Sequence, residues 1–527
     1  MDASLRKMPV GIQDFEKLRT EKCVYVDKTR YVYAMTRISS PHFLSRPRRF
    51  GKSLFISTLK AYFLGKKELF EDLAIAELEK DWIEYPVIYI DFNLGSCDCL
   101  QTVEITLNLI LDNYESEWGI TEKYSHLSVR LSKLIETAYK KSGKKVVVLV
   151  DEYDRALVNT MYDPPIHDDL RNFFKGFYGV LKGMDYALRF VFLTGVSKFA
   201  KVSVFSDLNQ LKDISLDERY AEICGISEAE LLEQFQPELQ ALAKATKKTF
   251  DETAAEVKKR YDGYRFSSEG TNMYNPFSLL NVFDSLRYAY YWFKTGTTTF
   301  LAQTLQKSHF DIRKFNNEVT IPVNEIDEYR ADETSLTPLL YQTGYLTVKS
   351  YDASLDEFTL GFPNEEVKYG FLNQLLPAYI PGWGLDDSFS VLTFIKAVRD
   401  GDVDEFMNLL RAYYAAIPYD LEENRDKGEK YYQLVFYLLF TNMGQFVDTE
   451  VKSAKGRADA VVKTADSIYV FEFKMDGNAT AEDALAQIDG KGYLIPYTAD
   501  HRRLVKIGVE FSQKAKGIKR WLVGQSI

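Results

Sequence analysis

The sequence has few of the residues that build disulfide frameworks and transition-metal sites, with 4 cysteines and 5 histidines among 527 residues. Only Cys97 and Cys99 lie close together, and one Cys-Asp-Cys without a second cysteine pair does not predict a zinc site. The histidines are scattered along the chain, so neither a zinc cluster nor a histidine-based catalytic triad is expected. We expect free thiols that are mostly buried.

Long apolar runs are also missing from the sequence. No segment approaches the ~18 apolar residues without charge that mark a membrane-spanning helix. The first residues, MDASLRKMPVGIQDFEKL, contain no apolar core of the kind found in a signal peptide. We therefore expect a soluble, cytoplasmic protein without a membrane partner.

An excess of positive charge is absent as well, because 66 Lys and Arg face 76 Asp and Glu, a net charge of −10. The chain as a whole is therefore not a generic binder of polyanions, although the average can hide a locally basic face. Its 46% hydrophobic and 27% charged residues are ordinary for globular proteins and argue against disorder. At ~100–200 residues per domain, the length predicts three or four folding units.

Strand-like and helix-like segments alternate over roughly residues 25–215. The run 146–150 (VVVLV) is almost entirely β-branched, which is typical of a parallel strand buried on both faces. Similar apolar runs occupy residues 86–94 and 187–195. The alternation predicts an α/β fold with a parallel sheet.

The pattern becomes helical from about residue 227, where Ser227 is suited to cap a helix. LLYQTGYLTVKSYD and the following FTLGFPN then predict a helix, a glycine and two strands, similar to a winged-helix unit. The last hundred residues again mix helices and strands. The expected regions are a parallel-sheet domain, a helical lid with a winged-helix-like part, a helical linker region and a second α/β domain, at residues 1–215, 216–365, 366–425 and 426–527.

The segment R-P-R-R-F-G-K-S (46–53) lies between an apolar strand and an amphipathic helix. A phosphate-binding loop requires backbone N–H groups around the phosphates, a lysine that reaches the β and γ oxygens, and a hydroxyl for Mg²⁺. Gly51, Lys52 and Ser53 supply the second half of this pattern, whereas Arg46 occupies the position of its first glycine. By itself, the segment is also consistent with a solvated basic turn.

Two acids follow the strand 146–150, namely Asp151 and Glu152. The carboxyl ends of parallel strands line the crevice in which α/β sheets bind ligands. Asp151 could hold Mg²⁺ together with Ser53, and Glu152 could orient an attacking water molecule. Solvated acids at a strand end are the alternative for this pair alone, but the pair and the basic loop together predict nucleotide binding.

Six ordered motifs resemble those of the bacterial AAA-ATPase-like family, a branch of the P-loop ATPases: GIQDFEKL, YVDKT, FLSRPRRFGKS, VDEYD, LTGVSKF and NPFSLLN. The resemblance covers about residues 5–280 and implies that ATP and Mg²⁺ are bound. It implies a nucleotide site made by Arg49, Phe50, Gly51, Lys52, Ser53, Asp151 and Thr194. Thr194 would sense the γ-phosphate, and Arg265 is a second sensor candidate. Arg155 is either an arginine finger or the partner of a surface salt bridge. The family commonly replaces the first glycine, as Arg46 does here.

A second constellation lies in GRADAVVKTADSIYVFEFK (456–474). If Lys463 pairs with Ile468 across a four-residue loop, Asp459 lies opposite Glu472. Alternation along the strand then places Lys474 on the same face. Two carboxylates and an ammonium group would meet there, as in a Mg²⁺ site for phosphodiester hydrolysis, with the Phe473 carbonyl as a further ligand. A solvated hairpin with a cross-strand salt bridge is the alternative.

Residues 428–515 resemble the PD-(D/E)XK nuclease superfamily, which implies a restriction-endonuclease-like α/β domain. Asp459 and Glu472 match its metal ligands and Lys474 its lysine, although Ala458 replaces the usual proline. Gln487, followed by Tyr493, resembles the auxiliary motif of the next helix. Glu450 is either an added acidic ligand or a solvated strand residue.

Charge gives modest support for nucleic acid, DNA or RNA, as the partner of this domain. Residues 426–527 carry 15 Lys and Arg and 13 Asp and Glu, so this region is at +2 and the rest of the chain at −12. The densest basic stretch comprises His501, Arg502, Arg503, Lys506, Lys514, Lys516, Lys519 and Arg520. Such a stretch can neutralise phosphates or simply solubilise the surface.

The sequence thus predicts an ATP-binding, ATP-hydrolysing protein that is coupled to a Mg²⁺-dependent nuclease. One alternative is a nucleotide-controlled switch whose nuclease-fold domain binds nucleic acid without cutting it. A phosphotransferase that uses ATP as its substrate is a second alternative. The possibility of a homo-oligomer stays open.

Overall fold

The computed structural model of the chain forms two compact units, and each is described by itself. Unit 1 comprises Met1–Thr295 and Glu318–Val367, and unit 2 comprises Gly296–Asn317 and Lys368–Ile527. The structure describes residues 6–38, 40–161, 163–198, 204–205, 210–292, 319–326, 336–371, 391–415, 429–442, 446–453, 456–464, 466–512, 514–515 and 517–524. Over these residues, no helix combines the length and the apolar character that crossing a bilayer requires.

The core of unit 1 is a five-stranded sheet in the order β2-β3-β4-β1-β5, and every neighbouring pair is parallel. Its strands are β1 (His42–Ser45), β2 (Val87–Asp91), β3 (Val146–Asp151), β4 (Leu188–Gly195) and β5 (Lys212–Asp213). All six residues of β3 are buried, as expected for a strand covered on both faces. This arrangement confirms the parallel α/β sheet predicted from the sequence.

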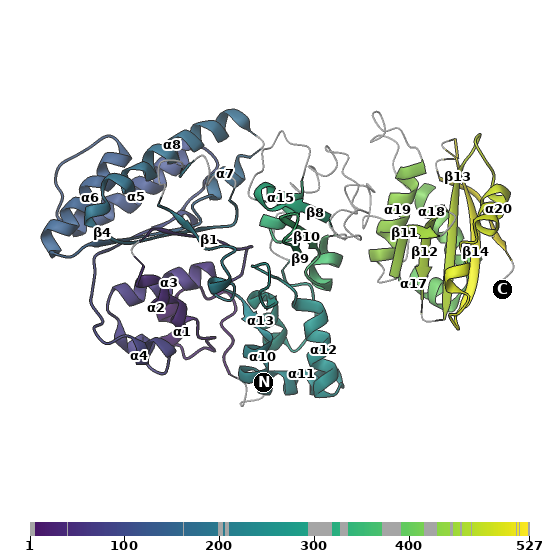
Figure 1. The fold of residues 1–527 in the computed structure, drawn as a ribbon, viewed down its shortest axis with the longest axis horizontal. Helices are drawn as coiled ribbons and strands as arrows, with labels where there is room; N and C mark the ends of the chain where they lie inside the picture. Colours follow the sequence, from purple (N-terminus) through teal and green to yellow (C-terminus); the bar gives the residue numbers. More distant parts are fainter. Residues whose placement is uncertain are drawn as a thin grey trace. The chain divides into compact units, whose positions relative to one another are not determined.

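Helices cover both faces of this sheet (Figure 1). They are α1 (Phe15–Thr20), α2 (Thr29–Thr36), α3 (Lys52–Phe63), α4 (Ala74–Leu78), α5 (Leu100–Glu117), α6 (Leu127–Ser142), α7 (Arg155–Asn159) and α8 (Pro164–Gly183). In Figure 1, α5, α6 and α8 lie on one side of the sheet and α1 to α4 on the other. Short 3-10 turns η1 (Lys67–Phe70), η2 (Phe92–Leu94), η3 (Asp185–Ala187) and η4 (Glu218–Tyr220) complete the layers. The sheet edge formed by the ends of β1, β3 and β4 is thereby held in a rigid frame.

A group of helices, called the lid below, follows the sheet. It consists of α10 (Glu228–Gln234), α11 (Gln236–Thr246), α12 (Phe250–Tyr261) and α13 (Pro276–Ser285), joined by the small β6 (Ile226–Ser227) and β7 (Met273–Tyr274) pair. Ser227 and Glu230 form a reciprocal capping box at the start of α10. The cap predicted at Ser227 is therefore confirmed.

The wing segment, residues 336–371, contains α15 (Thr337–Gln342), β9 (Thr347–Asp352) and β10 (Glu357–Gly361). The two strands are antiparallel, and β8 (Val319–Pro322) joins them in the order β8-β10-β9, with the turn η7 (Val323–Glu325) after it. Gly344 separates the helix from the hairpin and has φ 91°, which favours glycine. The predicted order of helix, glycine and two strands is confirmed.

Unit 2 contains a five-stranded sheet in the order β11-β12-β13-β14-β15. Its strands are β11 (Phe446–Ser453), β12 (Gly456–Lys463), β13 (Ser467–Met475), β14 (Arg503–Ser512) and β15 (Gly517–Gly524), and only β13 and β14 pair in parallel. Lys463 pairs with Ile468 and Val461 with Val470, the register predicted from the sequence.

The two faces of β13 meet different helices. Val470 packs in a cluster with Ile488 of α20 (Ala481–Lys491), which is followed by the turn η9 (Ile495–Tyr497). Phe471 and Phe473 instead contact Phe436 of α19 (Glu429–Asn442). Alternation of side chains along the strand explains this division, and it directs Glu472 toward the α20 face.

The helices α17 (Val391–Asp400) and α18 (Val403–Ala415) fall in the region expected to be a linker. Instead, they pack on the unit 2 sheet. Phe406 contacts Tyr469 at 5.5 Å between ring centroids, and Tyr414 contacts Phe511 at 5.4 Å. Aromatic side chains form this contact, and residues 368–527 accordingly belong to one compact unit with residues 296–317.

Candidate functional site

The loop between β1 and α3 has the shape of a phosphate-binding turn. Helix α3 begins at Lys52, directly after Gly51, whose φ is 92°. Arg49 also has a positive φ, 69°, which is uncommon for a residue with a side chain and concentrates at functional sites. The loop therefore delivers the N-terminus of α3, with its unpaired N–H groups, to the end of the parallel sheet.

Lys52 points into this loop and is buried. Its Nζ donates to the Arg46 carbonyl at 3.1 Å and to the Pro47 carbonyl at 3.4 Å, and lies 3.6 Å from Oε1 of Glu152. The structure thus brings together the lysine and the acid that the sequence placed in one site. Protein oxygens surround the ammonium group here.

Arg46 explains how the loop tolerates a large residue at the first glycine position. Its side chain is almost fully buried and donates to the carbonyls of Ser215, at 2.7 Å, and Tyr220, at 3.1 Å. The guanidinium also lies 4.1 Å from the ring centroid of Phe266. The side chain therefore turns out of the loop and into the body of unit 1, and the backbone keeps its course.

Asp151 and Ser53 meet at the end of β3. Burial, and then the charge of Glu152, raise the pKa of the Asp151 carboxyl to about 7, while a hydrogen bond from the Ser53 hydroxyl opposes the rise. Its Oδ1 accepts the N–H of Glu152 at 3.1 Å, and its Oδ2 is buried without a hydrogen-bond partner among the described residues. A buried carboxylate oxygen beside a hydroxyl fits the oxygen-donor chemistry of Mg²⁺.

The segment after β3 contains a residue with a strained backbone, Glu152, and a buried acid, Asp154, which connects it to β4. Glu152 has φ 53°, a left-handed conformation. Asp154 accepts hydrogen bonds from the N–H groups of Val196 and Ser197, which ties β3 to the end of β4. Gly195 is required here, because a Cβ would lie 2.3 Å from Oδ1 of Asp154.

Three predicted residues are already engaged elsewhere. The Thr194 hydroxyl donates to the Leu44 carbonyl at 2.9 Å and is buried. Arg155 donates to Oδ1 of Asn93 at 2.7 Å, which is a hydrogen bond and not the salt bridge considered above. Arg265 donates to the Lys349 carbonyl of β9 at 2.9 Å, so its guanidinium is used by the wing segment and the geometry does not support a sensor role.

The side chains of Arg49 and Phe50 pack against the lid, at α13 and at the segment between α12 and β7. The Arg49 guanidinium lies 3.9 Å from the ring centroid of Phe277, and the Phe50 ring lies 4.7 Å from that of Tyr264. Because both side chains are engaged in these contacts, Arg49 and Phe50 could bind a phosphate through their backbone N–H groups.

Sequence reasoning missed an apolar cavity beside the start of α3. It has a volume of about 90 Å³ and is lined by the N-terminal segment, by α3 and by the lid. Its lining includes Tyr25, Leu54, Cys224, Phe235 and Leu280. These positions come from five separate places in the chain and show no local pattern. An apolar cavity next to a phosphate-binding loop is suited to a flat heterocyclic base.

In unit 2, Asp459 lies where β12 separates from β13. The ladder runs as far as Ala460 opposite Phe471. The Asp459 carboxylate then accepts the Phe473 N–H at 2.7 Å, and the Gln433 amide of α19 donates to its other oxygen at 3.1 Å. The ladder does not continue to the expected pair of Asp459 and Glu472, because a side-chain oxygen replaces the backbone acceptor at this point.

Glu472 is buried at the α20 side of the sheet. Its Oε1 accepts Nζ of Lys474 at 2.8 Å and also the amide of Gln487. Gln487 in turn donates to the Tyr493 hydroxyl at 3.4 Å. The structure therefore joins four of the residues selected from the sequence, and it adds Gln433 on the Asp459 side.

The acids of unit 2 supply the oxygen donors that Mg²⁺ prefers, but no group of three or more His, Cys, Asp or Glu converges on one point among the residues that the structure describes. Glu450 belongs to β11, whose register with β12 places it across from Asp459. Its side chain lies outside the described residues.

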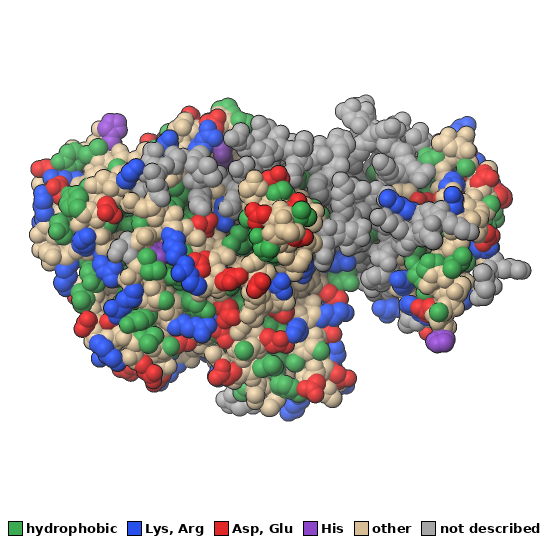
Figure 2. Space-filling view, in the orientation of Figure 1, with side chains coloured by type: hydrophobic (Ala, Val, Ile, Leu, Met, Phe, Trp, Pro, Cys, Tyr) green, Lys and Arg blue, Asp and Glu red, His purple; other side chains and the backbone are tan. Residues whose placement is uncertain are grey.

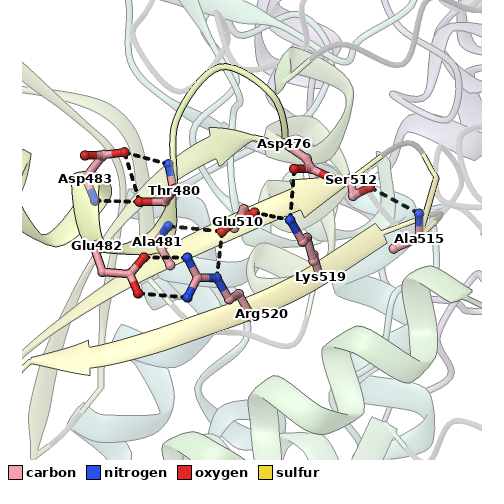
Figure 3. A network of polar contacts seen from close by, with 10 residues as sticks. All are labelled: Asp476, Thr480, Ala481, Glu482, Asp483, Glu510, Ser512, Ala515, Lys519 and Arg520. Atoms are coloured by element: carbon pink, nitrogen blue, oxygen red, sulfur yellow. Dashed lines mark hydrogen bonds and ion pairs between the residues drawn. The ribbon is translucent and has the colours of Figure 1, made fainter.

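Carboxylates pair with much of the basic C-terminal stretch. Arg520 binds Glu482 and Glu510, and Lys519 binds Asp476 and Glu510 (Figure 3). These hydrogen bonds lower the pKa of Glu510 although burial opposes the change. Lys506 pairs with Asp489 and Arg502 with Asp500 in the same way, and Lys516 lies outside the described residues.

Positive and negative side chains are interspersed over the visible face of unit 1 as well (Figure 2). The described part of that face therefore does not offer a polyanion a patch of a single sign.

Comparisons with known proteins find a match for each of the two α/β regions. Residues 9–205 match the family described as Predicted AAA-ATPase, and residues 427–521 match the PD-(D/E)XK nuclease superfamily. A protein of Azotobacter chroococcum mcd 1 named "Uncharacterized protein in vnfD 5'region" is 35% identical over 533 residues. The match covers 99% of this chain and 99% of that protein, so it spans both units.

Proposed function

The chain belongs to a family of predicted AAA-ATPases with a C-terminal PD-(D/E)XK nuclease superfamily domain, and we propose that it is an ATP-dependent, Mg²⁺-requiring nuclease. In this proposal, ATP binds and is hydrolysed at the loop of unit 1, and unit 2 cleaves phosphodiester bonds of DNA or RNA. In this proposal the protein acts in the cytoplasm, where ATP and nucleic acid both occur.

The observation that carries the nucleotide part is the meeting of Lys52, Ser53, Asp151 and Glu152 at one sheet edge beside an apolar cavity. The N–H groups at the start of α3 and the Lys52 ammonium would neutralise the phosphates. The cavity would take the base. Asp151 and Ser53 would hold Mg²⁺, which supplies positive charge for the phosphate oxygens.

Glu152 is the residue proposed to orient the attacking water. It now faces Lys52 at 3.6 Å, and this lysine would turn to the phosphates when ATP enters. Loss of the ion pair would leave the Glu152 carboxylate as an acceptor for a water proton. Binding would thereby prepare the site for hydrolysis.

The nuclease part of the proposal rests on Asp459, Glu472 and Lys474. A carboxylate oxygen has two lone pairs, so it can accept a hydrogen bond from Gln433 or Gln487 and still bind a cation. Mg²⁺ held by the two acids would act as a Lewis acid toward the phosphodiester. Lys474, which donates to Glu472 at 2.8 Å, would orient the attacking water.

A specific observation favours a second candidate, a nucleotide-controlled switch that binds nucleic acid without cutting it. The described residues contain no cluster of three acidic, histidine or cysteine ligands, and protein groups already hold Asp459 and Glu472. The complete set of Asp459, Glu472 and Lys474 favours cleavage, because a non-cutting domain has no need of all three.

One assay distinguishes these functions. The purified protein is incubated with plasmid, linear duplex and single-stranded substrates, with and without Mg²⁺ and ATP, beside the variant Lys52→Ala. We expect cleavage that requires Mg²⁺ and changes with ATP, and Lys52→Ala should lose the ATP effect. Binding of the substrates without cleavage under every condition would support the switch instead.

A further inference from the structure

The phosphate-binding loop of unit 1 is attached to the lid, to Trp292 and to the wing segment by Arg46, which replaces the first glycine of the motif, and by the four residues that follow it. Between Ser45 and Gly51 it reads Arg-Pro-Arg-Arg-Phe. Each of these five residues contacts a partner between residues 264 and 344: Phe266 for Arg46, Gly344 for Pro47, Trp292 for Arg48, Phe277 for Arg49 and Tyr264 for Phe50. A glycine-rich loop would lack the four side-chain contacts in this set, whereas the contact of Arg48 is made by its backbone carbonyl.

The wing segment touches the loop most closely at Pro47. A Cβ on Gly344 would lie 2.6 Å from the Cβ of Pro47, so only glycine fits this approach. The Gly344 carbonyl accepts the Tyr264 hydroxyl at 3.0 Å, and Tyr264 packs on Phe50. The wing segment and the loop therefore share one packed contact.

Glu366 forms a second connection between the wing segment and the loop. Its side chain is 1% exposed, and its Oε1 accepts the backbone N–H of Trp292 at 2.9 Å. The indole Nε1 of Trp292 donates to the Arg48 carbonyl at 3.3 Å. Burial raises the pKa of the Glu366 carboxyl to about 7, and the Ser278 side chain and the backbone N–H of Trp292 oppose the rise.

Nucleotide binding at this loop must disturb these contacts. Lys52 now donates to the carbonyls of Arg46 and Pro47. A bound phosphate would take the ammonium group and draw the backbone N–H groups of the loop inward. The peptide groups on either side of Pro47 and Arg48 would then rotate, which would shift the Pro47 ring that packs against Gly344 and the Arg48 carbonyl that Trp292 binds.

We propose that Glu366 is a positioning residue of the nucleotide site, which holds the phosphate-binding loop through Trp292 and transmits nucleotide occupancy to the wing segment. This inference rests on the proposed binding of ATP at the loop. Glu366 does not touch the phosphates in this account. It acts by fixing the loop that does.

The test compares Glu366→Gln with Glu365→Gln in the full-length protein. Both changes replace a carboxyl group with an amide at adjacent positions, but Glu365 pairs with Lys259 at 2.8 Å. Calorimetry measures ATP affinity, and hydrogen exchange of residues 336–371 is measured with and without ATP. Protection of the β3 and β4 backbone in the same data reports whether each variant is folded.

The wild-type protein and Glu365→Gln should show a change of exchange in the wing segment when ATP binds. Glu366→Gln should bind ATP about tenfold more weakly, the scale of one charge-assisted contact, and lose this change. Trp292→Phe, which keeps an aromatic ring and removes the Nε1 donor, should behave in the same way and replaces Glu366→Gln if that variant fails to fold.

Two results would overturn the inference. ATP binding with an unchanged wing segment in the wild type, or an unchanged response in both Glu366→Gln and Trp292→Phe, would show that the contacts are only structural. Absence of ATP binding by the wild-type protein would remove the proposed function together with this inference.

Discussion

Replacing Asp151 with asparagine should have two opposite effects, because burial of its charged carboxylate opposes folding and because we propose this carboxylate as a Mg²⁺ ligand. The carboxyl is 1% exposed at the end of β3, and burial raises its pKa to about 7. The amide of the substituted asparagine carries no charge and has nearly the same size. The variant should therefore be more stable than the wild type at high pH, and it should lose the Mg²⁺ dependence of ATP binding.

The size of the first effect follows from the pKa shift. Between pH ~4 and ~7 the folded protein holds a proton on Asp151 that the unfolded chain has released, so the free energy of unfolding falls as the pH rises. Above pH 7 the folded protein releases this proton as well, and the stability that the protonated Asp151 contributes at low pH is fully lost. At 1.36 kcal/mol per pH unit, the stability difference between variant and wild type should grow by about 3 kcal/mol from pH 5 to pH 8.

Calorimetric unfolding of the protein without nucleotide at both pH values measures this difference, which corresponds to roughly 5 °C in the melting temperature. ATP titrations with and without Mg²⁺ measure the second effect. A difference that is the same at pH 5 and pH 8 would refute the account of a buried acid at this site. Retained Mg²⁺ dependence in the variant would refute its role as a ligand.

Three further predictions concern hydrolysis, the base and the second metal site. Glu152→Gln should bind ATP normally and release phosphate at least ~100-fold more slowly, because the amide is a poor acceptor for the water proton; a phosphate-release assay measures this. Leu280→Trp should fill the apolar cavity and abolish ATP binding in calorimetry without changing any charge. Inorganic phosphate should still protect the loop in this variant. Gln433→Ala should weaken Mn²⁺ binding to unit 2 by about 10–100-fold in spin-resonance titrations, since partners that orient a metal ligand have effects of this size.

Local pattern was sufficient to predict much of the fold. The β-branched run of β3 identified a strand covered on both faces, and Ser227 identified the start of α10. The register of β12 and β13 followed from the length of one turn, because a hairpin leaves little freedom in pairing. These features depend on residues that are neighbours in the sequence.

Other features depend on residues far apart in the chain and left no local signal. The alternation of strands and helices was expected from about residue 25, but residues 23–28 form no ladder and the Val24 N–H instead donates to the Lys7 carbonyl. The burial of Arg46 requires carbonyls at Ser215 and Tyr220, and Arg265 is directed to Lys349 by the wing segment. Packing between distant segments decides these side chains.

The same limit applies to the site in unit 2. The sequence indicated that Asp459 and Glu472 would be near each other, but not that β12 and β13 separate at Asp459. Gln433 was missed because a glutamine in an apolar helix has no distinctive spacing. A glutamine buried in α19 beside an aromatic-rich face could have served as a signal, since a buried amide needs a polar partner.

The most direct test of the central claim is the Mg²⁺-dependent cleavage rate of Asp459→Asn relative to Asp466→Asn. Both variants lose one carboxylate from the same hairpin, but Asp466 is exposed at its turn. With ATP present, Asp466→Asn should cut nucleic acid like the wild type, and Asp459→Asn should bind it and fail to cut. Equal cleavage by the two variants would contradict the assignment of a nuclease site to Asp459.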